Sequence, residues 1–242
     1  MVLQLEFAGE RRSATGHRVI TMAERCSGVD HVMDADANPP ASDSISEHLH
    51  AWRVLPRGFY QRDPSEVARH MLGKILVHRE DTIATAGRIV ETEAYFGSED
   101  PASRAYKGKK RYNEVMWGEA GRTFIYMVHS NWLFNVITGQ TGEPGGVLVR
   151  ALEPLLGIET MKERRKSQNA RLLTSGPSRL TQALAITKEH HDLDISVPEG
   201  EIVILNPRKK PFKIAASHRI GVKRDLLTPL RFYVEGNPHV SR

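Results

Sequence analysis

Cysteine is almost absent from this chain of 242 residues, which contains only Cys26. A single cysteine excludes an internal disulfide bond and any metal site built from several thiolates. The chain also lacks the run of about 18 apolar residues that a transmembrane helix needs. Its first residues form too short an apolar stretch for a secretory signal. We therefore expect an intracellular protein that is neither secreted nor inserted in a membrane.

Signatures of several common enzyme classes are missing as well. The chain has no GxxxxGK loop for phosphates, no GxGxxG fingerprint for dinucleotides and no HExxH pair for zinc. Its densest histidine pair is His190–His191, and adjacent histidines more often lie in solvent than on a metal. We therefore expect neither a metal site nor a cofactor. The formal net charge of +5 permits a nucleic-acid partner but does not require one.

The chain divides into two unlike parts. Residues 1–52 show weak periodicity and contain a polar, proline-bearing stretch at residues 34–43, so we expect a disordered N-terminal extension. Order is predicted to begin near Leu55, which gives one domain over residues 53–242. In that domain, Asp63 followed by Pro64 predicts the start of a helix that Gly73 ends.

The hydrophobic pattern of the domain predicts more strands than helices. We expect strands over residues 74–78, 85–95, 122–128, 132–137, 146–152, 201–205, 213–220 and 230–234, and further helices over residues 158–165 and 175–184. Pro154 is expected to close the fifth strand, and Ser130–Asn131 to form a turn. Several strands follow one another without a helix between them. This order favours an α/β domain of the α+β kind, with a mainly antiparallel sheet and peripheral helices.

The strand at residues 85–95 carries the most informative side chains. Alternation along a strand places Glu91, Glu93 and Tyr95 on one face. Two acids on one face indicate either solvent exposure, which is usual for glutamate, or a chemical role. Arg150 lies in a strongly apolar strand, where a charge is costly unless it is paired. Its partner is either Glu153, in a structural ion pair, or the strand glutamate across a cleft.

Basic and aromatic residues are interleaved just after this strand. Such a loop is either an ordinary solvated segment or a surface that contacts phosphates. The basic residues are Arg104, Lys107, Lys109, Lys110 and Arg111. Further along, Phe124 and Tyr126 share a strand face that is either core or a wall for stacking.

Taken together, these residues resemble the alkyladenine (3-methyladenine) DNA glycosylase family. The resemblance spans about residues 55–242. The segments that carry it are GRIVETEAY (87–95), DPAS (100–103), NEVMWG (113–118), NVI (135–137), VLVRALEP (147–154), SGPSRLTQAL (175–184) and PLRFYVEGNP (229–238).

The resemblance implies a single compact domain around a curved antiparallel sheet, and an activity that hydrolyses the N-glycosidic bond of damaged purines. It places Glu93 as the general base, Tyr95 and Tyr126 as aromatics that stack on a flipped base, and Asn135 and Arg150 in the pocket. Arg150 would lie near the catalytic water and keep the carboxylate ionised. The backbone of residues 219–222 would border the site, and Glu91 is expected to be structural.

Two positions depart from the family pattern. Arg104 stands where many members have a histidine that contacts the base. His129 stands where many have the tyrosine that is pushed into the double helix as a wedge, so we assign the wedge to His129, with Asn131 or Trp132 as alternatives.

The resemblance implies a base-excision repair enzyme that acts on double-stranded DNA containing a damaged purine. No lysine is placed to form a Schiff base, so we expect a monofunctional hydrolase that leaves an abasic site. We also expect a monomer located with the DNA, in the cytoplasm or nucleoid of a prokaryote or in a nucleus. The alternatives are a protein that binds DNA lesions without excising them, and a domain that handles RNA or nucleotides.

Overall fold

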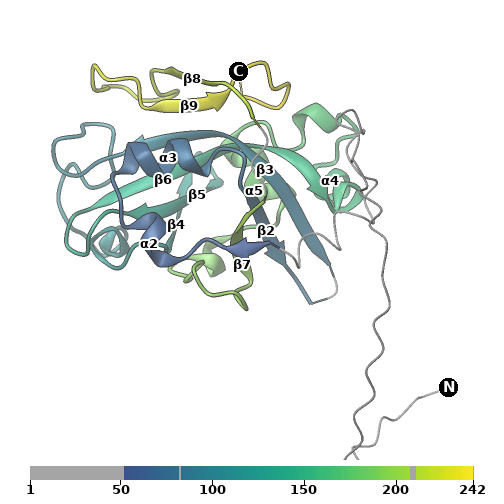
Figure 1. Ribbon diagram of the computed structural model, residues 1–242, viewed down its shortest axis with the longest axis horizontal. Coiled ribbons are helices and arrows are strands. Elements are labelled where there is room, and N and C mark those ends of the chain that lie inside the picture. The colour runs from purple at the N-terminus through teal and green to yellow at the C-terminus, as the bar shows by residue number, and fades with distance from the viewer. Residues whose placement is uncertain (1–51, 82, 208–210, 242) are drawn as a thin grey trace, which may run out of the picture. The chain divides into compact units, whose positions relative to one another are not determined.

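The computed structural model describes residues 52–81, 83–207 and 211–241. The disordered extension predicted for residues 1–52 therefore lies outside the described residues, apart from Trp52. The described part forms a nine-stranded sheet with antiparallel pairing and short helices around it (Figure 1). The predicted α+β domain on a curved antiparallel sheet is confirmed. Within these residues, no helix has the length and apolarity to cross a bilayer.

Two strands of 12 residues each, β3 and β6, form the middle of the sheet order β1-β7-β2-β3-β6-β5-β4. The strands are β1 (Arg53–Val54), β2 (Ile75–Arg79), β3 (Ala84–Tyr95), β4 (Thr123–Val128), β5 (Asn131–Thr138), β6 (Gly145–Leu156), β7 (Ile202–Asn206), β8 (Ile214–Ser217) and β9 (Arg231–Val234). The helices are α2 (Arg57–Tyr60), α3 (Pro64–Met71), α4 (Ile158–Arg165) and α5 (Pro177–Ala183), with 3-10 turns η1 (Glu114–Trp117), η2 (Ala170–Leu172) and η3 (Lys188–His190). β9 pairs with the last residues of β3 and with β8.

Helix α3 begins and ends as the sequence predicts. The Asp63 side chain accepts hydrogen bonds from two backbone N–H groups of the first turn, and Pro64 occupies the first helical position. Gly73 follows the helix with a φ of 81°, a left-handed conformation that favours glycine. The buried face of α3 packs on β3, where the Thr92 hydroxyl donates to the Ala68 carbonyl at 2.9 Å. One face of β3 is therefore covered by α3, and Glu91 and Glu93 lie on its opposite face.

Three predicted boundaries are wrong. The strand expected over residues 213–220 is shorter, since β8 ends at Ser217 and residues 218–220 continue as a loop that is held through Arg219 and Asp225. β6 continues through Pro154 to Leu156, because the proline lies beside a register shift, where the ladder tolerates a missing N–H. The turn between β4 and β5 is His129–Ser130, not Ser130–Asn131, since both residues have left-handed φ values of 46° and 61° and Asn131 pairs with Val128. These φ values are typical of the two-residue turns that match strand twist.

The histidine pair is not in solvent, contrary to the expectation from the sequence. His190 is buried, and His191 accepts a hydrogen bond from the Ile125 N–H at 3.2 Å. Both residues therefore belong to the packed structure beside β4.

The main hydrophobic core draws on α3, α5 and the central strands. Its large, fully buried side chains include Leu76, Ile89, Phe134, Leu152 and Phe232. Charged groups buried against such an interior are costly unless they are paired. The buried charges of β3 and β6 therefore mark the place where the domain departs from ordinary packing.

Candidate active site

A local irregularity between β3 and β6 positions the central charged residues. Glu91 pairs with Ala151 in the ladder, whereas the next residue, Thr92, pairs with Val149. Arg150 is therefore the extra residue of a β-bulge on β6. Bulges redirect side chains and are enriched beside active sites.

The Arg150 guanidinium binds both glutamates of β3. Its Nε donates to Glu91 Oε1 at 2.8 Å, and its Nη1 lies 3.1 Å from Glu93 Oε1. The alternative partner, Glu153, lies instead 3.6 Å from Arg88. Of the two pairings left open by the sequence, the structure has the one with the strand glutamates.

Glu91 is enclosed by groups that hold it in place. Arg231 donates to Glu91 Oε1 at 2.7 Å, and Ser241 donates from its backbone N–H to Oε2 at 2.6 Å and from its hydroxyl to Oε1 at 2.8 Å. With Arg150, these contacts tie β3, β6, β9 and the C-terminal segment together. Arg231 and Ser241 were not found from the sequence, because only tertiary folding brings residues up to 150 positions apart into contact.

The Glu93 carboxylate is fully buried but has polar partners on both oxygens. Oε1 accepts from the Ile220 N–H at 2.8 Å, and Oε2 accepts from the Tyr95 hydroxyl at 2.8 Å. Burial raises the pKa of Glu93 above its ordinary value, although Arg150 and the two hydrogen bonds act in the opposite direction. Desolvation is the largest influence on this pKa, and the charge of Arg150 acts in the direction expected from the sequence, toward the ionised carboxylate.

An ion-pair network holds the backbone that reaches Glu93. Arg219 donates to both oxygens of Asp100 at 2.6 and 2.7 Å and to Asp225 at 2.9 and 2.6 Å. Burial alone would raise the pKa of Asp100, but the hydrogen bonds and charge of Arg219, together with hydrogen bonds from the Phe96 and Ala102 N–H groups, outweigh it and lower that pKa. The guanidinium also lies 4.5 Å from the centre of the Tyr95 ring. Arg219 therefore supports both Tyr95 and the neighbouring Ile220.

An open cleft of about 770 Å³ lies in front of these residues. Tyr95, Arg150 and Ile220, the three partners of Glu93, all line it. The buried carboxylate thus lies directly behind the wall of the cleft. Its other lining residues include Arg104, Lys107, Lys110, Tyr126, His129, Asn131, Lys223 and Arg224.

Aromatic side chains form two parts of the cleft wall. Tyr126 lies over Phe124, with ring centres 4.9 Å apart, and Phe124 belongs to the core while Tyr126 faces the cleft. The Arg104 guanidinium covers the Tyr126 ring at 4.6 Å. Asn135 is buried beside this wall, where its amide donates to the Phe124 carbonyl at 3.0 Å, and it does not line the cleft.

The predicted basic loop is divided by the fold. Lys107 and Lys110 line the cleft, whereas Lys109 borders a separate hollow and Arg111 lines neither. Lys223 and Arg224 form basic parts of the cleft wall that the sequence analysis did not assign. Their signal in the sequence was the basic pair directly after the matched segment at 219–222.

The tip of the β4–β5 hairpin projects at the edge of the cleft. His129 is exposed and lines the cleft, and its carbonyl accepts from the Asn131 side chain at 2.7 Å. Asn131 in turn accepts from Gln182 on α5 at 2.8 Å. Trp132 packs against the core. Of the three wedge candidates, His129 is the one whose side chain these contacts do not anchor.

Residues 58–238 match the family model described as methylpurine-DNA glycosylase. The chain belongs to the methylpurine-DNA glycosylase family. It is thus a DNA glycosylase, a hydrolase of base-excision repair, and DNA is its substrate.

Relatives of this DNA glycosylase occur in bacteria and archaea. A protein from Methanoculleus marisnigri is 42% identical over 194 residues, which cover 78% of this chain and 99% of the relative. A protein from Clostridium tetani is 41% identical over 204 residues, covering 78% and 98%. One from Aeropyrum pernix is 39% identical over 194 residues, covering 78% and 94%. All three carry the provisional name 3-methyladenine DNA glycosylase.

Proposed function

We propose that this glycosylase releases alkylated or deaminated purines, of the 3-methyladenine, 7-methylguanine and hypoxanthine type, from double-stranded DNA. Water activated by Glu93 would hydrolyse the N-glycosidic bond and leave an abasic site. The observation that carries the proposal is the buried Glu93 carboxylate, held by Arg150, Tyr95 and the Ile220 N–H directly behind an open cleft.

The damaged base would enter the cleft after rotating out of the double helix. Base flipping costs a few kcal/mol, and less for a damaged base that stacks and pairs poorly. Tyr95 and Tyr126 offer aromatic faces, and a purine alkylated at N3 or N7 carries positive charge that such faces attract. Asn135, which is buried behind Tyr126, acts by shaping this wall rather than by touching the base.

Glu93 would serve both as the general base and as a stabiliser of charge. Oε1 is occupied by the Ile220 N–H and Arg150, whereas Oε2 accepts only the Tyr95 hydroxyl among the described residues. Oε2 therefore keeps a lone pair that can take a proton from water. As the bond between the sugar and the purine breaks, the carboxylate stabilises the oxocarbenium charge on the sugar. Water oxygen then bonds to the anomeric carbon, its proton goes to Glu93, and the purine leaves with the bonding electrons.

The surroundings of Glu93 favour a monofunctional enzyme. An enzyme that also cleaves the strand through a Schiff base needs an amine beside the sugar. The described side chains that contact Glu93 are those of Arg150 and Tyr95, and no lysine is among them. Lysines 107, 110 and 223 line the cleft as exposed residues, which suits contact with phosphates.

DNA would approach across the basic walls of the cleft, with His129 at the hairpin tip filling the gap left by the flipped base. We expect the protein to act as a monomer. A role on DNA places the protein with the cell's DNA.

The test is the substitution Glu93→Gln. Glutamine keeps the size of the side chain and can still accept from the Ile220 N–H, but its amide cannot take a proton. We expect base release from a panel of lesion-containing duplexes to fall by about 10²- to 10⁴-fold, the usual contribution of a general base, while binding to the same DNA is retained. Alkali-induced nicking measures release, and a gel-shift assay measures binding.

Glu153→Gln is the matched control, since it makes the same change on β6 at a residue that pairs with Arg88 outside the cleft. Turnover retained by Glu93→Gln would remove Glu93 from its role. A wild-type protein that binds lesions but releases no base would support the non-catalytic alternative.

A further inference from the structure

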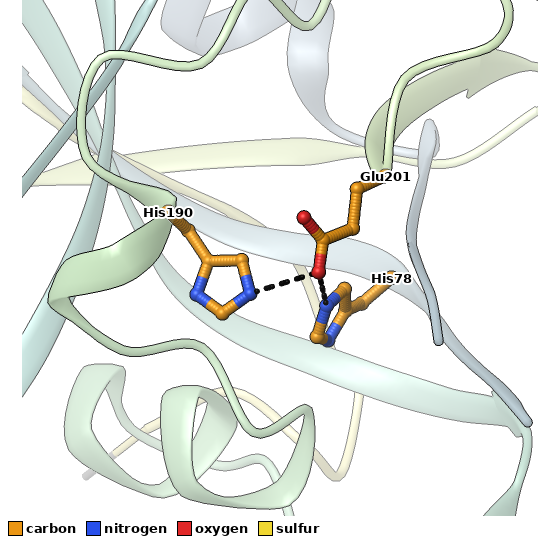
Figure 2. A group of neighbouring side chains, drawn as sticks. All are labelled: His78, His190 and Glu201. Atoms are coloured by element: carbon orange, nitrogen blue, oxygen red, sulfur yellow. Dashed lines mark hydrogen bonds and ion pairs between the residues drawn. The ribbon is translucent and has the colours of Figure 1, made fainter. Parts of the chain in front are cut away.

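Two histidines and a glutamate meet in a cluster that does not line the cleft (Figure 2). His78 lies on β2, His190 on η3, and Glu201 directly before β7. Glu201 Oε1 lies 3.1 Å from His78 Nε2 and 3.3 Å from His190 Nε2. Two imidazole nitrogens from distant parts of the chain thus point at one carboxylate oxygen.

The proton on His78 is placed by its other neighbour. His78 Nδ1 lies 2.5 Å from the Leu184 carbonyl oxygen, and a carbonyl oxygen only accepts. Nδ1 therefore carries the hydrogen, and in a neutral imidazole Nε2 has a lone pair. This lone pair faces the electron-rich Glu201 Oε1 at 3.1 Å, an arrangement that needs a positive ion or an extra proton between them. A metal-bound histidine commonly has this same contact from its second nitrogen to a backbone carbonyl.

His190 is held with its Nε2 toward the same point. Its Nδ1 accepts a hydrogen bond from the Thr187 backbone N–H at 2.9 Å and lies 3.3 Å from the Thr187 carbonyl oxygen. Without an ion, a neutral His190 therefore carries its hydrogen on Nε2, which donates to Glu201. Coordination through Nε2 uses the other tautomer, in which Nδ1 carries the hydrogen and donates to the Thr187 carbonyl. The two imidazole rings are nearly perpendicular, at 87°, with centres 4.7 Å apart. Neither ring therefore blocks the other's Nε2.

We propose that His78, His190 and Glu201 bind one divalent metal ion of the zinc class. Two imidazoles and one carboxylate are a donor set that Zn²⁺ prefers, whereas Mg²⁺ and Ca²⁺ prefer oxygen ligands alone. Bonds of about 2.0–2.1 Å in a tetrahedron place ligand atoms about 3.3 Å apart. The two separations from Glu201 Oε1, 3.1 and 3.3 Å, match this spacing, and the two Nε2 atoms lie within 4.8 Å of each other. The histidines are buried, while the Glu201 side chain is 51% exposed and gives the ion a route to solvent and a water ligand.

The location indicates a structural role for the ion. The His190 carbonyl accepts from the Thr123 hydroxyl at 2.5 Å, and the next residue, His191, accepts from Ile125. η3 is thus attached to β4, the strand that carries Tyr126. An ion bound by His78, His190 and Glu201 would fasten this segment to β2 and β7, and so stiffen the strand beneath one wall of the cleft.

The test uses the full chain, stripped with a chelator and then titrated with Zn²⁺. We expect one ion per chain by elemental analysis and calorimetry, and a Tm that rises with Zn²⁺ concentration because the ion binds only the folded state. Co²⁺ offered in place of Zn²⁺ should give the visible absorption of a tetrahedral nitrogen and oxygen site.

Glu201→Gln is the variant of choice, because Glu201 is partly exposed whereas the two histidines are buried. We expect it to bind Zn²⁺ at least about tenfold more weakly, since loss of even an outer partner of a metal site costs that much. His70→Gln, at an exposed histidine on α3, is the control and should keep one ion per chain. The proposal is overturned if wild type takes up no stoichiometric Zn²⁺ or if Glu201→Gln binds it equally well; the cluster would then be held by an extra proton on His78. Neither measurement of Zn²⁺ binding depends on base release, so the outcome is independent of the proposed function.

Discussion

At the scale of single residues, opposing influences on Glu93 decide its readiness to take a proton. Burial raises its pKa, while the charge of Arg150 and hydrogen bonds from Ile220 and Tyr95 lower it. A carboxylate with a raised pKa is a stronger base than an ordinary glutamate, provided that it remains ionised at the working pH. The balance therefore suits the proposed role of general base, with a basicity above that of an ordinary glutamate.

This balance predicts the pH dependence of base release. In its proposed role Glu93 must be ionised, so activity should fall as the pH drops through its pKa in the folded enzyme. The acidic limb of the pH profile is the range over which activity is lost as the pH falls. Because the pKa of Glu93 is raised, the midpoint of this limb should lie above the ordinary glutamate pKa of about 4.3. Tyr95→Phe keeps the ring but removes one hydrogen bond to the carboxylate, and should move the limb upward by up to about one pH unit. Single-turnover rates over a pH series measure both, and an unmoved limb in Tyr95→Phe would contradict this account.

Arg104 gives a second prediction at this scale, about the choice of lesion. Its guanidinium already covers Tyr126, so it competes with a cationic purine for the ring and repels its charge. Arg104→Gln should therefore raise the release of 7-methylguanine relative to neutral hypoxanthine. A contact of about 0.5–1 kcal/mol corresponds to a roughly two- to fivefold change in the rate ratio. Lys107→Gln, which removes a cleft cation without a ring contact, is the comparison, and an equal change in both variants would show a general charge effect.

At the scale of elements, the loop between β8 and β9 acts as one wall of the site. Asp225 accepts from the Arg219 side chain and from the backbone N–H groups of Arg219 and Leu226, which fixes the course of the loop. Ile220 in this loop supplies the N–H to Glu93. The loop has no strand pairing of its own at this point, so its position depends on the ion pairs.

Asp225→Asn tests this dependence. Breaking a buried ion pair by removing one partner costs about 3–5 kcal/mol, and the partial exposure of Asp225 and the remaining bonds to Asp100 favour the lower end. We expect a lower Tm and, because the Ile220 N–H is less firmly held, a lower single-turnover rate with little change in DNA affinity. Loss of stability with an unchanged rate would show that the loop is structural only.

The elements themselves were largely predictable, because their periodicity and caps are local signals. The residues of β3 and the bounds of α4 follow from the pattern, as does the start of α3 at Asp63. The bulge at Arg150 and the passage of β6 through Pro154 were not, since they depend on the register with the neighbouring strand. A single sequence contains no record of that register.

The candidate site also contains both residues that local sequence signals predict and residues that only the fold brings together. Glu93 was marked by its strand and by family resemblance, whereas Arg231 and Ser241 at Glu91, and Glu201 beside His190, come from segments that meet only in the fold. Their contacts span between 11 and 150 positions of the chain.

At the scale of the whole molecule, the exposed cations that line the cleft come from two separate segments. Residues 104–110 supply one group and residues 223–224 the other, and both line the cleft. The formal net charge of only +5 means that this local gathering, rather than the overall charge, would govern contact with the DNA backbone. Basic groups from two segments around one cleft suit contact with the phosphates near a flipped nucleotide.

The salt dependence of DNA binding tests this arrangement. Each phosphate contact contributes about 0.9 to the slope of log affinity against log salt concentration, so reversing Lys107 and Lys110 to glutamate should flatten the slope by up to about 2. Reversing Lys188 and Lys213, which are exposed and lie outside the cleft, changes the net charge equally and should leave the slope nearly unchanged. Lys109→Glu alone should have a smaller effect than Lys110→Glu alone, because Lys109 borders a different hollow. Equal flattening by the two double variants would mean that DNA responds to net charge and that the cleft walls are not the contact surface.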